Sequence, residues 1–193
     1  IESITSPAPT TRRLRLVSSD GGPPPTGRPG QHVALRVRLG TAFLPRPHTL
    51  PGAADGPCEV TVQREPAGAF GGWLLEQAAA GQALEVSRQA GRFLWDGGPA
   101  PILFFAAGIG ITPALAFART LVDRGWPHRL VVDWSTPRAG RRAPWADLET
   151  IDRANLELNL RCTAQAGRLS SADVVRWVQC FPSARCFVCG PKG

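Results

Sequence analysis

The stretch ILFFAAGIGITP, residues 102–113, constrains the fold of this chain more than any other part of its sequence. It begins with a continuous apolar run, which is typical of a parallel β-strand that is covered on both faces. Gly108 and Gly110 follow, and a segment with helical periodicity then opens at Thr112 and Pro113. Proline suits the first position of a helix, and threonine suits the cap before it. The stretch therefore predicts a strand, a tight glycine turn and a helix.

This turn comes at the carboxyl end of its strand, which is the edge where open α/β sheets bind their ligands. The N–H groups and the dipole at the start of a helix favour an anion there, and glycine lets the backbone approach a pyrophosphate closely. A tight turn without a ligand is the alternative, and both interpretations stay open from this pattern alone. The pattern is not G-x-G-x-x-G, because position 113 is proline.

The rest of the second half alternates strands and helices. Strands are expected at 128–135, 156–163 and 185–190. Helices are expected at 113–125 and 143–152, and a last helix begins after its cap, Ser170 or Ser171, and ends at residue 180. Gly125 is the expected end of the first helix, whose apolar stripe contains Leu115, Ala118, Leu121 and Val122. This alternation predicts a parallel α/β sheet.

The first half is rich in β-strands. Residues 12–18, 32–39 and 58–64 alternate polar and apolar residues, and 82–88 is a further short strand. One helix is expected at 72–81, and turn-forming residues separate the strands. The pattern predicts a small antiparallel barrel or sandwich, and the change of texture at 96–101 marks the boundary with the second half.

Composition narrows the class of protein. The net charge is +7, but the arginines are scattered and Lys192 is the only lysine, so nucleic-acid binding is not favoured. No apolar run is long enough to span a membrane. Five cysteines, an odd number, argue against a disulfide framework, and Cys180, Cys186 and Cys189 lack a zinc spacing. We expect no metal site and reduced thiols in a cytoplasmic protein.

Because the chain starts at Ile1 and stops at Gly193, we also expect a piece of a longer polypeptide.

Three further stretches accompany AAGIGITP at 106–113, namely PGQHV at 29–33, RPHTL at 46–50 and FVCGP at 187–191. In this order and spacing the chain resembles the ferredoxin–NADP reductase superfamily over its whole length. It looks most like the oxygenase-reductase and flavohaemoglobin-reductase branch. The resemblance implies two domains: an antiparallel β-barrel flavin-binding domain at 1–96, followed by an α/β parallel-sheet NAD(P)-binding domain at 97–193 that ends short of the family's usual length.

The resemblance also implies a set of flavin contacts. Arg46 would pair with the flavin phosphate, as a guanidinium suits, and Thr49 would hydrogen-bond near flavin N5. His48 would stack on the flavin ring in place of the family's tyrosine. The remaining residues matched to the flavin site are Pro47, Val62, Gln63, Gly71 and Gly72. The implied cofactor is FAD, with FMN as the alternative, and Trp73 departs from the small serine that the family has beside the phosphate.

The nucleotide site implied by the resemblance lies in the second domain. The turn made by Gly108, Gly110, Thr112 and Pro113 would hold the nucleotide, and Arg138 could select NADPH over NADH. Cys189, Gly190 and Pro191 would lie where nicotinamide C4 meets flavin N5, which makes Cys189 and Thr49 the candidate catalytic residues. Arg138 departs from the family pattern, because the arginine is expected two positions earlier.

The function implied is a flavin-dependent NAD(P)H oxidoreductase. A hydride would pass from NAD(P)H to the flavin, and electrons would then pass singly to an iron–sulphur protein, a haem protein or an oxygenase. No carboxylate pair or Ser–His–Asp arrangement in the sequence suggests other chemistry. The alternative is a non-catalytic subunit that keeps this fold for complex assembly.

Overall fold

The structure is a computed structural model that describes residues 1–193 except 24, 40–41, 51–57, 65–68, 96, 126, 138–142, 152–153 and 192–193. The chain forms two compact units, Ile1–Leu94 and Trp95–Gly193. The assignment of the first to a flavin and the second to a nucleotide stays a prediction. Within the described ranges, no helix combines the length and the apolar character needed to cross a membrane.

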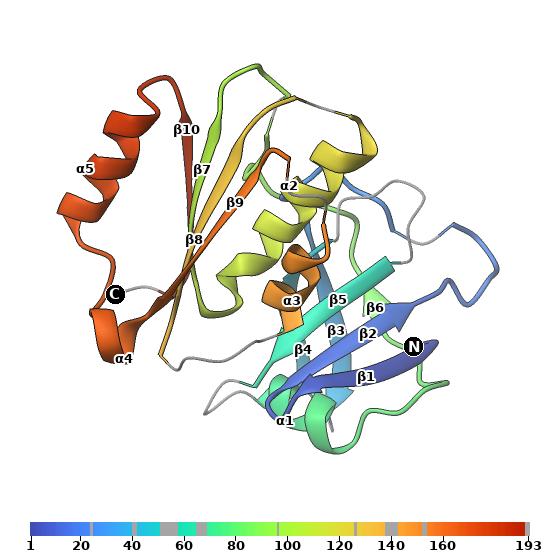
Figure 1. Ribbon diagram of the computed structural model, residues 1–193. Helices are drawn as coiled ribbons and strands as arrows, with labels where there is room; N and C mark the ends of the chain where they lie inside the picture. The colour runs from blue at the N-terminus through green and yellow to red at the C-terminus, as the bar shows by residue number, and fades with distance from the viewer. Residues whose placement is uncertain are drawn as a thin grey trace. The chain divides into compact units, whose positions relative to one another are not determined.

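The first unit is built from two three-stranded antiparallel sheets (Figure 1). One has the order β1-β2-β5 and the other the order β4-β3-β6. The strands are β1 (Ser3–Ala8), β2 (Thr11–Leu16), β3 (His32–Leu39), β4 (Ala42–Thr49), β5 (Cys58–Gln63) and β6 (Glu85–Val86), and the helix is α1 (Ala69–Glu76). The predicted antiparallel architecture is confirmed.

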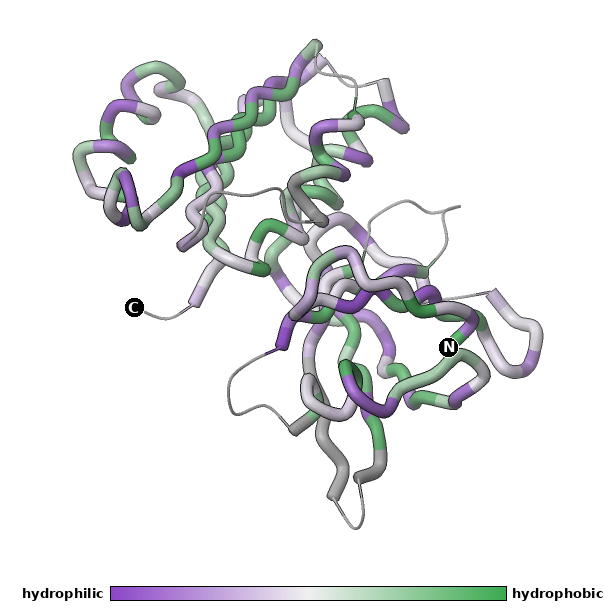
Figure 2. The backbone as a smooth tube through the Cα atoms, turned by 60° about the horizontal axis from the view of Figure 1, so that its bottom comes forward, coloured by the Kyte–Doolittle hydropathy of each residue, from purple (hydrophilic) through white to green (hydrophobic). Residues whose placement is uncertain are grey.

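A single apolar core holds the two sheets and α1 together. The alternating residues Val33, Leu35 and Val37 of β3 are buried, as the period of two in the sequence predicts. Apolar residues of the other sheet and of α1 complete this core: Leu14, Leu16, Val60, Val62, Phe70 and Leu74. Figure 2 shows hydrophobic segments recurring along these strands. A shift of any strand by one residue would turn its apolar side chains to water, so the core fixes the register.

Two elements of this unit differ from their predicted limits. The helix expected at 72–81 begins at Ala69 and ends at Glu76, because Phe70 and Leu74 are the side chains that reach the core. Gly81 then takes a φ of +86°, which is incompatible with a continuing helix. The strand expected at 82–88 is limited to Glu85 and Val86, which pair with β3, and the N–H group of Ser87 also donates to the carbonyl oxygen of Ala34.

The second unit has a four-stranded parallel sheet in the order β10-β7-β8-β9. Its strands are β7 (Ile102–Ala107), β8 (Leu130–Thr136), β9 (Leu156–Cys162) and β10 (Arg185–Cys189). The helices are α2 (Thr112–Asp123), α3 (Ala143–Glu149), α4 (Thr163–Ala166) and α5 (Ser171–Cys180). Figure 1 shows α2 and α3 on one side of the sheet and α5 on the other. The predicted α/β domain architecture is confirmed.

Alternate residues of β7 anchor these helices to opposite faces of the sheet. Phe104 packs against Phe117 of α2, with ring centroids 5.6 Å apart, and stacks on Phe187 of β10. On the other face, Leu103 and Phe105 form a cluster with apolar residues of α5. The unbroken apolar run of β7 is therefore explained by burial on both faces.

The C-terminal end of α2 and the N-terminal end of α5 lie where the sequence predicts them. Gly125 follows α2 with a φ of +58°, and Ser170 caps α5 in a reciprocal arrangement with Asp173. Of the predicted stripe on α2, Val122 is the exception, because 49% of its surface is exposed.

Candidate functional site

The candidate site lies where the order of the parallel sheet reverses. From β7 the chain goes to β8 and β9 on one side, and β10 then pairs with β7 on the other. The carboxyl ends of β7 and β10 are thus neighbours, and Cys189 pairs with Ala106. In open α/β sheets a ligand crevice forms at such a reversal. The glycine turn after β7 and the Cys-Gly-Pro segment after β10 both start there.

Gly110 and Gly190 let these two segments touch. A Cβ atom on Gly110 would lie 2.2 Å from the carbonyl oxygen of Cys189 and 3.0 Å from the nitrogen of Gly190. A Cβ atom on Gly190 would lie 2.9 Å from the Cβ atom of Ala107. Backbone atoms cannot move aside as a flexible side chain can, so glycine at 110 is required by packing inside the protein. The sequence suggested a ligand or a tight turn as the reason for this glycine, and not a contact with the segment after β10.

Gly108 has a different reason to be glycine. Its φ is +55°, in the left-handed region, and a Cβ atom there would meet nothing within 4 Å. Its carbonyl oxygen accepts a hydrogen bond of 2.8 Å from the indole Nε1 of Trp134. Trp134 is buried in β8 and was not among the predicted site residues. The turn thus has open space at Gly108, where a ligand could approach, and is held by a rigid side chain of the neighbouring strand.

The start of α2 corrects the predicted role of Thr112. Residues Gly108–Ile111 form a 3-10 turn that runs directly into the helix, and the capping position is Ile111, which already has helical dihedral angles. Thr112 is therefore the first helical residue, and its hydroxyl donates to the carbonyl oxygen of Ile109 at 3.1 Å. Pro113 is buried and is the second residue of the helix, so the helix begins one position earlier than predicted.

Cys189 is half-buried at the end of β10, and this burial raises the pKa of its thiol above the ordinary value. The thiol is therefore protonated at neutral pH and is a poor nucleophile. Gly190 and Pro191, which follow it, are exposed. Cys189 therefore lies directly beside the glycine turn, and its backbone is in contact with Gly110.

The predicted flavin residues are grouped in the first unit around the end of β4 and the start of α1. His48 and Thr49 are half-buried, and the ring centroid of His48 lies 5.7 Å from that of Phe70 in α1. The backbone of Arg46 pairs with Leu35, but the side chain of Arg46 lies outside the described residues. Arg138 lies outside them entirely.

The other predicted flavin residues belong to β4, β5 and α1. Val62 is 4% exposed, belongs to the core and pairs with Arg12 of β2. Gln63 is half-buried, and Pro47 is exposed. Gly71 is buried in α1, and a Cβ atom on Gly72 would meet nothing within 4 Å. An aromatic ring, a hydroxyl group and an open helix turn are parts that can hold a flavin.

The described residues contain no group of three or more histidine, cysteine, aspartate or glutamate side chains that could hold a metal ion. The five cysteines are all free thiols.

Comparisons with known proteins agree with this architecture. No family model matches the chain. It is 30% identical over 174 residues to an NADPH oxidoreductase of Mycobacterium tuberculosis, an alignment that covers 86% of this chain and 46% of that protein. It is 28% identical over 202 residues to a flavohemoprotein of Chromobacterium violaceum, with 92% of this chain and 50% of the relative covered. The chain thus spans about half the length of these relatives.

Among solved structures, the flavohem-like FAD/NAD-binding domain of nitric oxide dioxygenase from Vibrio cholerae superposes with a TM-score of 0.79. The match covers 99% of this chain and 97% of that domain at 18% identity. An antiparallel β unit followed by a parallel α/β unit defines a two-domain reductase fold. The chain has the fold of the ferredoxin–NADP reductase superfamily, and the resemblance that its four motifs indicate is confirmed.

Proposed function

We propose that the chain is the flavin-dependent NAD(P)H oxidoreductase part of an electron-transfer protein. Bound FAD would supply the chemistry, since a flavin accepts a hydride from a nicotinamide and can release electrons one at a time. The chain's own residues would bind the two cofactors, fix their orientation and limit the access of water. Both curated relatives carry oxidoreductase or flavohaem names, and these names support the proposal.

The contact between the Gly110 turn and Cys189 is the observation that carries this proposal. It brings the segments after β7 and β10 together at the reversal of the sheet, where the fold class binds nucleotides. The open space beside Gly108 would admit the pyrophosphate of NAD(P)H, and the start of α2 would favour its negative charge. Thr112, Pro113, Gly190 and Pro191 would shape the walls around it.

The flavin would lie on the first unit, near β4. Arg46 would pair with its phosphate, while His48 and Thr49 would contact its ring. Pro47, Val62, Gln63, Gly71 and Gly72 are the further proposed contacts. We favour FAD over FMN because the solved domain that covers the whole chain is named as an FAD/NAD-binding domain.

The electron acceptor would be a haem protein, an iron–sulphur protein or an oxygenase. The flavohemoprotein relative supports a haem acceptor. A glycine betaine monooxygenase reductase subunit of Pseudomonas aeruginosa, 32% identical over half of this chain, supports an oxygenase acceptor. The choice between NADH and NADPH would depend on Arg138. We propose a cytoplasmic location, which is consistent with a reductase that uses NAD(P)H.

The absorption spectrum of the purified protein tests the flavin assignment. We expect flavin bands in the visible range and release of FAD on denaturation. Arg46→Ala should lose the flavin while the protein stays folded. Arg36→Ala is the matched control, because Arg36 lies in the adjacent strand β3, where it is paired with Glu85 at 3.9 Å. A folded, colourless wild-type protein that fails to bind added FAD would favour the non-catalytic subunit instead.

A further inference from the structure

Arg12 is a charged residue in a row of side chains that otherwise faces the core of the first unit. In β2 it continues the row of Leu14 and Leu16, which are buried, and it pairs in register with the core residue Val62 of β5. Side chains two residues apart in a strand lie on the same face of the sheet, so Arg12 points to the core side. A half-buried guanidinium at such a position requires compensation from its surroundings.

The guanidinium of Arg12 is bound to the end of α1. Its Nη2 atom donates a hydrogen bond of 2.9 Å to the carbonyl oxygen of Leu75, and its Nη1 atom donates to the hydroxyl of Ser6 in β1. Leu75 is the last residue but one of α1. Arg12 therefore joins the first sheet to the C-terminal end of this helix.

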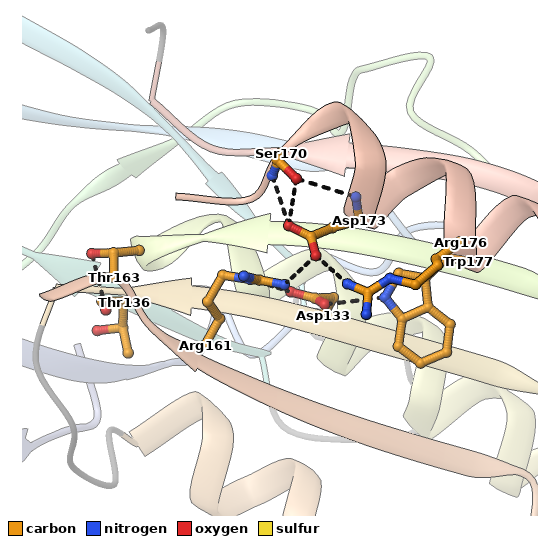
Figure 3. A network of polar contacts seen from close by, with 8 residues as sticks. All are labelled: Asp133, Thr136, Arg161, Thr163, Ser170, Asp173, Arg176 and Trp177. Atoms are coloured by element: carbon orange, nitrogen blue, oxygen red, sulfur yellow. Dashed lines mark hydrogen bonds and ion pairs between the residues drawn. The ribbon is translucent and has the colours of Figure 1, made fainter. Parts of the chain in front are cut away.

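The partners of Arg12 differ from those of Arg161, the half-buried arginine of β9. Arg161 lies beside two carboxylates, Asp173 at 3.3 Å and Asp133 at 3.8 Å (Figure 3). Among the residues that the structure describes, no carboxylate forms an ion pair with Arg12. The carbonyl groups at the C-terminal end of a helix carry a partial negative charge, so α1 takes the place of a counter-ion for Arg12.

The carbonyl oxygen of Leu75 depends on Arg12 because the helix does not continue past it. The N–H group of Ala79, four residues further on, donates to the side-chain oxygen of Gln82 instead, at 2.8 Å. The last carbonyl groups of a helix need partners outside the helix. The last turn of α1 contains no basic residue of its own, and Arg12 supplies this cation from β2.

Helix α1 needs such support because its sequence makes it intrinsically weak. It is only eight residues long, and Gly71 and Gly72 lie inside it. An isolated helix of this length is not stable in water, and glycine is among the least favourable residues in a helix. The side chains of Phe70 and Leu74 attach α1 to the core, and Arg12 holds its C-terminal end.

Neither packing nor backbone conformation requires glycine at position 72. A Cβ atom there would meet nothing within 4 Å, and Gly72 is not among the described glycines that have a positive φ. Gly72 lies in the first half of α1, close to the end where the N–H groups and the helix dipole favour an anion. A glycine that weakens its helix without serving the fold is explained by a ligand that comes close to the backbone.

We propose that Arg12 is a positioning residue for the flavin phosphate. By fixing the C-terminal end of α1, it holds the bare backbone at Gly72 in the place where the phosphate is bound. This inference rests on the proposed function, which assigns Gly71 and Gly72 to the flavin. Arg12 itself would touch neither the flavin nor its phosphate, because its guanidinium is engaged at the opposite end of the helix.

Titration of the flavin-free protein with FMN and with riboflavin tests this proposal, because the two molecules differ only by the phosphate group. Arg12→Gln should weaken FMN binding about fivefold and leave riboflavin binding unchanged. Arg12→Lys keeps a cation at the end of α1 and should recover part of the loss. Arg15→Gln is the matched control, since Arg15 lies in the same strand and pairs with Glu2 at 2.6 Å on the exposed side. Thermal unfolding shows that each variant is folded.

The outcomes separate a positioning role from a merely structural one. A selective loss of FMN affinity that the lysine variant partly restores supports the proposal. Equal weakening of FMN and riboflavin would overturn it, because the change would then have damaged the first unit as a whole. Unchanged binding of both molecules by Arg12→Gln would overturn it as well. A wild-type protein that binds neither molecule and no FAD would instead refute the proposed function, and this inference with it.

Discussion

The indole N–H of Trp134 donates a hydrogen bond of 2.8 Å to the carbonyl oxygen of Gly108. Gly108 holds a left-handed backbone conformation at the start of the glycine turn, and Trp134 is a rigid residue buried in the neighbouring strand β8. A peptide group that is fixed in this way cannot rotate when a ligand approaches. The relationship gives the proposed nucleotide site a preformed backbone, which lowers the ordering cost of binding.

Trp134→Phe should weaken nucleotide binding without affecting the flavin. The change keeps an aromatic ring but removes the donor to Gly108, and the loss of one such hydrogen bond costs about 1 kcal/mol, or about fivefold in affinity. We expect a KM for NAD(P)H that is raised by this factor, with an unchanged flavin spectrum. Thr120→Val is the matched control, because it removes a buried hydrogen bond to Ala116 within α2. Equal effects of the two changes on KM would count against a specific role for Trp134.

Gly110 and Gly108 should respond differently to substitution. Gly110→Ala places a methyl group against the Cys189 backbone at 2.2 Å, so β7 and β10 have to move apart at their carboxyl ends. We expect a lower thermal midpoint and a loss of NAD(P)H binding. Gly108→Asn has open space and a residue type that tolerates positive φ, so it should stay near wild type in stability. Thermal unfolding of both variants decides the matter, and equal destabilisation would contradict this account of the turn.

The size of the side chain at position 189 should matter more than its chemistry. Burial raises the pKa of the Cys189 thiol, so a thiolate nucleophile is not expected at neutral pH. We expect NAD(P)H to reduce the flavin of the Cys189→Ser variant at close to the wild-type rate. Cys189→Leu should be much slower, because reacting atoms have to come within about 3.5 Å of each other. Stopped-flow reduction by NAD(P)H measures both rates, and an inactive Cys189→Ser variant would refute a role through size.

Acid stability should depend on the cap of α5. Hydrogen bonds from the backbone and the side chain of Ser170 lower the pKa of Asp173 to about 2. A carboxyl group whose folded pKa is depressed stabilises the protein above its unfolded pKa. This contribution is lost as the pH falls from about 4 to 2.

Ser170→Ala should therefore lower the free energy of unfolding at pH 7 by about 1 kcal/mol, as the loss of a helix cap does. The difference from wild type should shrink as the pH falls through this range. Ser171→Ala, one residue into the helix, is the matched control. Urea unfolding across the pH range gives both quantities, and a difference that grows in acid would be the wrong sign for this mechanism.

Strong periodic patterns in the sequence were sufficient to predict an antiparallel β unit followed by a parallel α/β unit, while the two-domain reductase fold came from the resemblance of four motifs. The apolar run of β7 and the alternation in β3 predict burial on two faces and on one face respectively, and the structure confirms both. The Ser170 cap was also predictable, because serine followed three residues later by an acidic residue is a local signal. These features depend on residues that are near one another in the chain.

Features that depend on contacts between distant segments were not predictable. The contact of Gly110 with Cys189 and the bond from Trp134 to Gly108 join residues on different strands. Thr112 looked like a cap because nothing in the sequence shows that a 3-10 turn leads directly into α2. The polar pair of Asp133 and Asn159 was missed for the same reason, since these residues meet through the pairing of β8 with β9.

Anaerobic reduction of the flavin-loaded protein by NAD(P)H tests the central claim most directly. If the chain is a hydride-transferring reductase module, the visible flavin bands should bleach on mixing. A nicotinamide that carries deuterium at the transferred C4 position should slow this bleaching. A protein that retains its flavin but is bleached by neither NADH nor NADPH, while dithionite still reduces it, would contradict the account.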